Sequence, residues 1–281
     1  MNPSGMARLS TEARLLAGYL PRFEDAYRRL NRREFVSPDP LEKLYLYGSA
    51  GDREVVGLAV SSIAYGRVAQ ILQNADRILA VLGSSPKKFL EETAPGDLPG
   101  LFKGFRHRFS SGAEIGALLA GIGAVLREFG GVERFFESCL EGEKNFVDAV
   151  SRFSEGIRSR AGLGKNFLLP SPREGSACKR LFLYLKWMIR SDDVDPGGWK
   201  AASPADLMLP LDVHMFRMCS SLGLTKRKSA DLRSAEELTA LFRQFVPGDP
   251  VKYDFVLTRF GIRREMDAGE FVNLCLEGDE S

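Results

Sequence analysis

The sequence is poor in cysteine, and its cysteines are not paired. The four residues of this type, Cys139, Cys178, Cys219 and Cys275, lie far apart in the chain. Zinc sites and iron–sulfur clusters take ligands in close pairs such as Cys-x-x-Cys, and no such spacing occurs. Asp192, Asp193 and Asp195 lack the full pattern of a cation-binding loop, so we interpret them as a capped turn. We therefore expect neither a metal nor another cofactor.

Long apolar runs are also missing. No stretch of about 18 uninterrupted apolar residues, the length of a transmembrane helix, is present. The first residues, MNPSGMARLSTEARLL, lack the apolar core and the small-residue cleavage site of a signal peptide. The sequence thus predicts a cytoplasmic protein that does not enter a membrane.

An excess of one charge is absent as well. Lys and Arg number 39 and Asp and Glu number 37, which gives a net charge of +2. Many nucleic-acid-binding proteins are strongly basic, and the bulk charge gives no such indication here. Any basic surface must therefore be local.

Alternating strand patterns are scarce, and helical patterns replace them. Apolar residues recur at three and four positions, the spacing of one helix face. The clearest examples are Leu15, Leu16, Tyr19, Leu20 and Phe23, and then Leu118, Leu119, Ile122, Val125, Leu126 and Phe129. The Pro- and Gly-rich stretches at 170–175 and 195–198 are too short to separate domains. The sequence predicts a single all-α domain over residues 1–281, with a helix at about 10–32 that packs on the rest.

Capping residues and glycines indicate where several helices begin and end. A capping side chain or an early proline marks the starts, and glycine marks the ends. We expect starts at Gly51 and Asp52, at Ser203 and Pro204, at a capping box of Ser234 and Glu237, and at Asp249 and Pro250. We expect ends at Gly130 with Gly131 and at Gly261.

The two histidines of the chain each lie in a polar and aromatic cluster, at 104–109 and at 210–217. In the second cluster Leu211, Met215 and Met218 follow a helical stripe. Asp212 is then expected at the helix N-terminus, where a carboxylate caps free backbone amides. Such a cap occurs on helices of every function, so its position alone does not make Asp212 catalytic.

The stretch LDVHMFRMCSSLGL at 211–224 resembles a signature of the endonuclease III superfamily of DNA glycosylases, Asp-Thr-His-x-x-Arg followed by Leu-Gly-Leu. Other landmarks follow the same order. DREVVGLAVSS at 52–62 resembles the early helix that leads to the DNA-probing loop, 104–131 the following linker and helix, and FVPGDPVKYDFVLTRFG at 245–261 a later helix. The similarity covers about residues 35–265.

The whole-chain pattern also resembles an uncharacterised bacterial family of conserved hypothetical proteins, a remote branch of this superfamily. The resemblance implies a fold of two interlocked helical subdomains with a cleft between them. It also implies that Asp212 is the aspartate essential for base excision.

The helix-hairpin-helix motif of the superfamily, Leu-Pro-Gly-Val-Gly-x-Lys, is absent. LPSPREGSACK at 169–179 takes its place, followed by RLFLYLKWM. This stretch resembles the Lys-Thr-(apolar)n-Lys-Met helix of archaeal 8-oxoguanine DNA glycosylases, which implies that Lys179 is the nucleophile. Lys186 is the alternative nucleophile. We expect Lys179 in the first turn of an apolar helix, where the positive helix end and partial desolvation favour the neutral amine. The alternative is a solvated lysine without a role.

The chemistry implied is attack of the Lys179 amine on C1′ of a flipped nucleotide, assisted by the Asp212 carboxylate. A Schiff base would allow strand cleavage. Base excision also needs a wedge that fills the gap in the base stack. Tyr65 or Arg67, at the end of the early helix, occupies the position where the superfamily inserts a side chain. The alternative is a glycine that ends the helix beside an interfacial tyrosine.

Aromatic and basic residues provide candidates for the remaining DNA contacts. Phe105, His107 and Phe109 could stack on a base, or Phe105 and Phe109 could be core residues at positions i and i+4. Trp187 and His214 are candidates for the base pocket, with a core position as the alternative for Trp187. Candidates for phosphate contacts, or else for a solvated surface, are Arg106, Arg108, Arg173, Arg180, Lys226, Arg227 and Lys228.

Three functions are compatible with these patterns. The first is a monofunctional or bifunctional DNA glycosylase, with AP-lyase activity in the second case, that acts as a monomer on double-stranded DNA containing a damaged base. The second is a non-catalytic DNA- or RNA-binding protein that retains the fold. The third is a protein-interaction scaffold. Only the enzyme would form a covalent adduct with lesion-containing DNA through Lys179.

Overall fold

The computed structural model describes residues 9–263 and 265–277. Helices make up 62% of the residues that the structure describes and strands 2%, so the prediction of an all-α protein is confirmed. The chain forms two compact units. The middle unit contains residues 36–203. The terminal unit is built from both ends of the chain, up to Phe35 and from Pro204 onwards.

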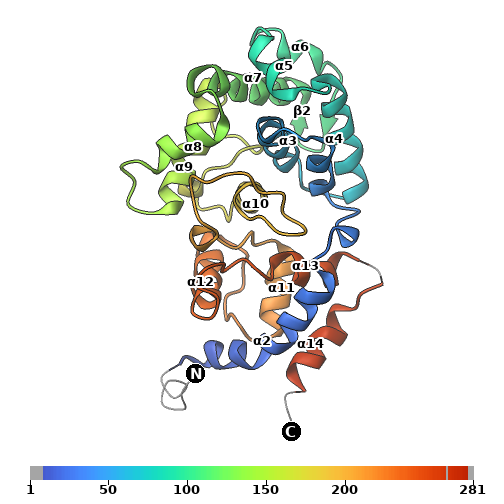
Figure 1. Cartoon of the computed structure of the whole chain (residues 1–281), viewed down its shortest axis with the longest axis vertical. Coiled ribbons are helices and arrows are strands. Elements are labelled where there is room, and N and C mark those ends of the chain that lie inside the picture. Colours follow the sequence, from blue (N-terminus) through green and yellow to red (C-terminus); the bar gives the residue numbers. More distant parts are fainter. Residues whose placement is uncertain (1–8, 264, 278–281) are drawn as a thin grey trace. The chain divides into compact units, whose positions relative to one another are not determined.

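The terminal unit is a group of helices around an aromatic core. Its elements are α2 (Thr11–Leu30), the 3-10 helices η1 (Arg33–Phe35) and η4 (Pro204–Asp206), α11 (Val213–Ser221), α12 (Leu232–Arg243), α13 (Asp254–Ile262) and α14 (Ala268–Leu276). Helix α2, expected at about 10–32, packs against α12, α13 and α14 (Figure 1). Phe23 of α2 lies at the centre, with its ring 5.7 Å from that of Tyr253 and 6.0 Å from that of Phe271.

The middle unit contains the remaining elements. These are η2 (Pro40–Leu46), α3 (Ala50–Ser62), α4 (Val68–Leu82), α5 (Pro86–Glu92), α6 (Leu98–Leu101), β1 (Arg106–His107), β2 (Ser110–Ser111), α7 (Gly112–Phe129), α8 (Val132–Leu140), α9 (Phe146–Arg160), η3 (Pro172–Glu174) and α10 (Lys179–Ile189). Helix α3 packs against α10, and α7 packs against α5, α6 and α9 (Figure 1). The rings of Phe136, Phe153, Tyr184 and Trp199 contact one another in the core.

Helix α7 approaches its neighbours through glycines. A Cβ atom added at Gly116 would lie 2.4 Å from the Cα atom of Pro99, and one at Gly112 would lie 1.9 Å from the carbonyl oxygen of Phe102. The backbone of α6 and the residues after it can lie this close only because α7 lacks side chains at these positions. Within residues 9–263 and 265–277, no single helix is long and apolar enough to cross a membrane; α7 and α8 pass that test only as a pair, bent by 77°.

Some of the expected helix limits are confirmed. Helix α7 ends at Phe129, and Gly130 follows in the left-handed conformation with φ of 77°. Helix α3 begins one residue before the expected Gly51 and is capped by Ser49. The expected start at Ser203 and Pro204 leads only to the three-residue η4, which begins at Pro204 and ends at Asp206.

Two expected starts in the terminal unit are wrong. Asp231, not Ser234, caps α12, because the Asp231 carboxylate accepts the Ser234 amide at 2.9 Å. The Ser234 hydroxyl donates instead to the carbonyl oxygen of Ser229. Asp249 and Pro250 lead into turns, and α13 begins only at Asp254.

The expected end of α13 also needs correction. Gly261 lies inside its last turn, and the helix ends at Ile262. The glycine serves packing here, because a Cβ atom at position 261 would lie 2.7 Å from Nδ1 of His214.

Candidate nucleic-acid interface

The loop after α3 and the β1–β2 hairpin form one surface in the middle unit. The Tyr65 hydroxyl lies 2.9 Å from the carbonyl oxygen of His107 and 2.8 Å from Oγ of Ser110. Gly66 has φ of 102°, and a Cβ atom there would lie 2.9 Å from Cδ of Arg108. The structure therefore brings together the predicted wedge loop and the predicted aromatic and basic cluster.

His107 is buried beneath this surface and connects the hairpin to the loop after α3 through a hydrogen bond. It is buried, and its Nε2 lies 3.0 Å from the carbonyl oxygen of Tyr65, which can only accept, so Nε2 carries the proton. Its Nδ1 then accepts from Nδ2 of Asn74 at 2.9 Å. Burial lowers the pKa of His107, and the charges of Arg108 and Arg180 lower it further. The prediction that His107 stacks on a base is wrong, because both ring nitrogens and its surface are used within the fold.

The segment 104–109 is not a helix, because it contains the first strand and the turn of the hairpin at 106–111. Arg106 pairs with Ser111 and His107 with Ser110, so Arg108 and Phe109 form the turn, with φ of 49° at Arg108. The interpretation of Phe105 as a core residue is correct, since its ring is buried. The same interpretation is wrong for Phe109, which is 68% exposed, because a hairpin places its turn in solvent.

Phe109 packs against a second exposed aromatic residue, Phe167, which the sequence patterns did not indicate. Phe167 is 50% exposed, and its ring meets the ring of Phe109 edge-on, with centroids 5.7 Å apart. The other neighbour of Phe167 is Tyr65, with centroids 4.9 Å apart. The guanidinium of Arg108 lies 5.3 Å from the ring centroid of Phe109. Phe167 lies in a loop between α9 and η3, where no periodicity marks it.

The buried guanidinium of Arg180 packs against two of these aromatic rings, those of Tyr65 and Phe167. Its guanidinium donates to the carbonyl oxygens of Ser62, Phe167 and Leu168, and it lies 4.7 Å from the ring centroids of both Tyr65 and Phe167. Burial lowers its pKa to about 10. The prediction that Arg180 contacts phosphate is wrong, because its donors are buried against these carbonyls.

The accessible part of this region contains exposed aromatic rings and exposed guanidinium groups. Arg67, Arg106 and Arg108 are exposed, and Tyr65 is half-buried between the aromatic rings. Exposed rings for stacking and guanidinium groups for phosphate are the combination that nucleic-acid-binding surfaces use. We define the hairpin surface as Tyr65, Arg67, Arg106, Arg108, Phe109 and Phe167.

Helix α10 carries both lysines considered as nucleophiles. Lys179 is its first residue and is half-buried, as expected. Lys186 is 2% exposed, and its Nζ lies 3.9 Å from Oδ1 of Asp195. Lys186 is thus buried in the core beside a carboxylate, which favours Lys179. Trp187 is also buried, so its prediction as a pocket residue is wrong and its core alternative is correct.

The acidic residues after α10 form the turn that was expected. Oδ1 of Asp192 accepts the amides of Val194 and Asp195, both at 2.8 Å. Burial raises the pKa of Asp195 to about 6, although it pairs with Arg190. The described part of the chain contains no group of three or more His, Cys, Asp or Glu side chains that could hold a metal ion.

Asp212 lies in the terminal unit at the expected helix end. It is the N-cap of α11, and its Oδ1 accepts the amides of His214 at 2.9 Å and Met215 at 2.8 Å. These two bonds fix the orientation of the carboxylate, which is half-buried.

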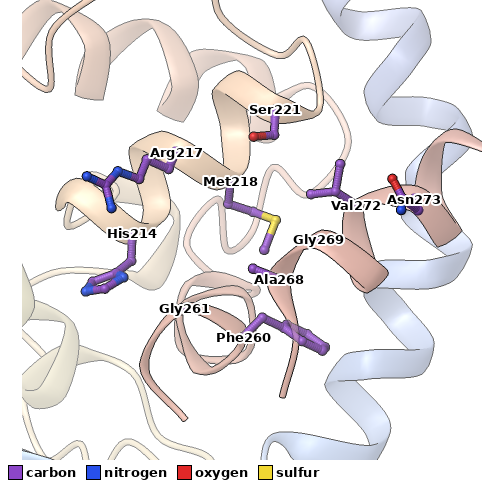
Figure 2. Close-up of a pocket in the computed structure, with 10 residues that line it drawn as sticks. All are labelled: His214, Arg217, Met218, Ser221, Phe260, Gly261, Ala268, Gly269, Val272 and Asn273. Atoms are coloured by element: carbon purple, nitrogen blue, oxygen red, sulfur yellow. The ribbon is translucent and has the colours of Figure 1, made fainter. Parts of the chain in front are cut away.

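His214, predicted for a base pocket, lines a cavity within the terminal unit (Figure 2). The cavity measures about 380 Å³ and lies among α11, α13 and α14. His214 and Arg217, three residues apart on α11, lie on the same side of it in Figure 2. The imidazole packs against the last turn of α13 at Gly261.

The other predicted phosphate contacts are largely paired with carboxylates. Arg173 contacts Glu155 at 3.0 Å and Glu143 at 4.0 Å. Nζ of Lys226 lies 3.0 Å from Glu12. Arg227 contacts Asp231 and Glu237, both at 3.1 Å, and Lys228 is exposed. For Arg173, Lys226 and Arg227 the alternative of a solvated surface therefore describes the structure better, and each of these side chains pairs with a carboxylate.

A family model matches residues 39–263, and its description is "Protein of unknown function (DUF2400)". The chain belongs to this family. No curated protein and no solved structure matches the chain significantly. The match includes the whole hairpin surface, α10 with Lys179 and α11 with Asp212. Helix α14, which forms one wall of the cavity, lies after the matched region.

Proposed function

We propose that the chain is a base-excision DNA glycosylase with AP-lyase activity that acts on a damaged base in double-stranded DNA. The observation that carries the proposal is the position of Lys179 and Asp212. Each stands at the N-terminus of a helix and is half-buried, at the positions that the resemblance assigns to the nucleophile and its assistant.

In the proposed reaction, Nζ of Lys179 forms a bond to C1′ of the flipped nucleotide while the bond from C1′ to the base breaks. The electron pair of that bond leaves with the base, which takes up a proton. The Asp212 carboxylate stabilises the positive charge that develops on the sugar and accepts the proton lost by the amine. Ring opening then gives a Schiff base, and loss of a C2′ proton expels the 3′ phosphate.

The hairpin surface supports the DNA-binding part of the proposal. The ring of Tyr65 is enclosed by His107, Phe167 and Arg180, and its hydroxyl is bonded, so it is not available for insertion. We propose that Phe109 or Arg67, both exposed, fills the gap in the base stack. Arg106 and Arg108 then contact phosphates, which makes binding sensitive to salt.

The fold of two interlocked glycosylase subdomains and the cytoplasmic location belong to the same proposal. The division of the chain supports the proposed fold, because both ends of the chain build one unit and its middle builds the other. The proposed partner is lesion-containing duplex DNA, bound by a monomer.

The test is borohydride trapping on a panel of lesion-containing duplexes. Wild type should form a covalent adduct with at least one duplex, and Lys179→Gln should form none. Asp212→Asn should slow excision by about 10² to 10⁴-fold, as expected for the loss of an acid–base group. Lys144→Gln, an exposed lysine of the middle unit, is the matched control and should behave as wild type. Adduct formation that is unchanged in Lys179→Gln would refute the mechanism.

A non-catalytic nucleic-acid-binding protein is the second candidate, favoured by the exposed rings of Phe109 and Phe167. In that case single-stranded oligonucleotides should bind with a steep salt dependence while every lesion remains intact. Phe109→Ala should weaken binding by about 1–3 kcal/mol, the usual contribution of one stacked base. Leu46→Ala removes an equally exposed side chain, 68%, and should have no effect.

A further inference from the structure

The cavity of the terminal unit has a polar side supplied by one face of α11. His214, Arg217 and Ser221 follow one another at three and four residues, so their side chains lie on the same face of the helix. Figure 2 shows the imidazole and the guanidinium at the same end of the lining, with Met218 between them and Val272. This end thus combines the planar, permanently charged donor of an arginine with a histidine ring.

The charge of the lining is of one sign. Among the ten lining residues, His214 and Arg217 are the only ones that can carry a charge, and none is Asp or Glu. Within the described residues, neither side chain has a hydrogen bond or an ion pair. This distinguishes Arg217 from Arg227 in the same unit, which contacts two carboxylates. The two side chains are therefore available to an anion.

The start of α14 does not itself supply the anion site. The Asp267 carboxylate already accepts the amides of Gly269 and Glu270, at 2.6 and 3.0 Å. An anionic ligand would have to displace this cap to reach those amides. Recognition of an anion therefore depends on Arg217 and His214.

Most of the remaining lining is apolar, and Asn273 of α14 is its polar member. Met218 forms a buried part of the lining, and Phe260, Ala268 and Val272 contribute from α13 and α14. The ring of Phe260 stacks on Phe271 at 4.1 Å, which holds it in place. The volume of about 380 Å³ lies near the lower end of the range of about 300–1,000 Å³ for small-molecule sites. The space suits a compact molecule with an apolar body, not a polymer segment.

We propose that this cavity binds a small organic anion, with a single phosphate or carboxylate group on Arg217 and His214 and a flat apolar body against Met218, Phe260 and Val272. The site lies within the terminal unit and includes α14, which follows the family match. It does not depend on the proposed glycosylase function, because neither Lys179 and Asp212 nor the residues of the hairpin surface line it.

Isothermal titration of the whole chain with four probes tests the proposal. Adenosine 5′-monophosphate and benzoate each combine an anionic group with a flat body, and they distinguish phosphate from carboxylate. Adenosine lacks the anion and inorganic phosphate lacks the body. Saturable binding of at least one of the first two, at least tenfold tighter than either fragment, is the expected result.

Substitutions then locate the binding. Arg217→Gln should weaken the bound probe about tenfold or more, as expected for the loss of a charge-assisted contact. Arg233→Gln, an exposed arginine of α12 outside the cavity, is the matched control and should leave binding unchanged. Val272→Phe fills the cavity from the α14 side without touching the charges and should abolish binding. Because Arg217 is exposed, its substitution keeps the test valid even if Val272→Phe impairs folding.

Three results would overturn the proposal. The first is the absence of saturable binding for both amphipathic probes, and the second is binding that Arg217→Gln and Val272→Phe leave unchanged. The third is competition by duplex DNA together with an equal loss of DNA affinity in Arg217→Gln, because Arg217 and His214 would then serve the DNA backbone. Loss of trapping activity in Lys179→Gln with unchanged probe binding would separate this site from the proposed glycosylase reaction.

Discussion

Arg180 shows how a single buried cation can organise a surface. Its guanidinium joins the end of α3 to the loop that carries Phe167, through bonds to the carbonyl oxygens of Ser62, Phe167 and Leu168. Arg180→Met should destabilise the protein by roughly 3–5 kcal/mol, because three buried carbonyl groups lose their donor. Urea unfolding measures this loss. Arg106→Gln, an exposed arginine of the same surface, should change stability by less than about 0.5 kcal/mol, and equal effects would contradict the role of Arg180.

His107 should make the stability of the protein depend on pH. Folding lowers its pKa below the ordinary 6.5, so the unfolded chain binds the proton more readily. The contribution of the neutral ring is complete above about pH 6.5 and is lost as the pH falls from there through the folded-state pKa. Wild type should therefore lose more free energy of unfolding between pH 7 and pH 5 than His107→Gln, which keeps a neutral donor and acceptor. Urea titrations at several pH values measure the two slopes, and parallel slopes would exclude this role.

At the scale of the element, the glycines of α7 have two opposing effects on stability. Glycine lowers the helix propensity, but it also lets the neighbouring backbone pack closely against the helix. In an open helix, Gly→Ala stabilises by about 0.5–1 kcal/mol. Gly18 of α2 is such a position, because a Cβ atom there has nothing within 4 Å. Gly116→Ala should instead destabilise by about 1–3 kcal/mol, since its Cβ atom would overlap the backbone of Pro99. Thermal unfolding of the two variants should move in opposite directions, and a gain in both would show that α6 is able to yield.

The sequence predicted a helix well where its segment contains only one possible apolar stripe, start or stop. The stripe from Leu15 to Phe23 and the glycine stop at Gly130 each lie in a segment with one possible interpretation. The start of α12 failed because two capping residues, Asp231 and Ser234, lie three positions apart. Which of them caps is decided by Arg227, which binds the Asp231 carboxylate and also donates to the Ser234 hydroxyl. That contact is not visible in a capping pattern.

The candidate site was predictable only where residues lie next to each other in the sequence. Asp212 as a cap and Lys179 as the first residue of α10 follow from local patterns. The hairpin did not, because strands of two residues are too short to alternate. The exposure of Phe167 and the burial of Arg180 arise from contacts between distant segments, which no spacing rule contains.

At the scale of the molecule, each unit has its own core. In the terminal unit, Phe23 contacts Phe242, Tyr253 and Phe271. That unit needs both ends of the chain, so no single cut in the sequence isolates it. The middle unit is continuous in sequence over residues 36–203 and contains the cluster around Phe153 and Trp199. A continuous segment with its own buried core meets the requirement for independent folding.

We therefore predict that a fragment of residues 36–203 folds alone. Both tryptophans of the chain, Trp187 and Trp199, are buried in this unit, so their fluorescence reports on its core in the fragment and in the whole chain alike. The indole Nε1 of Trp199 donates to Oε1 of Glu54 at 3.0 Å, and Glu54 also accepts the amide of Val132 at the start of α8. The fragment should show the same blue-shifted emission as the full chain and a cooperative urea transition. Glu54→Ala should weaken both proteins by about 1–3 kcal/mol, since buried donors lose their acceptor. Red-shifted emission from the fragment would show that the middle unit needs the chain ends to fold.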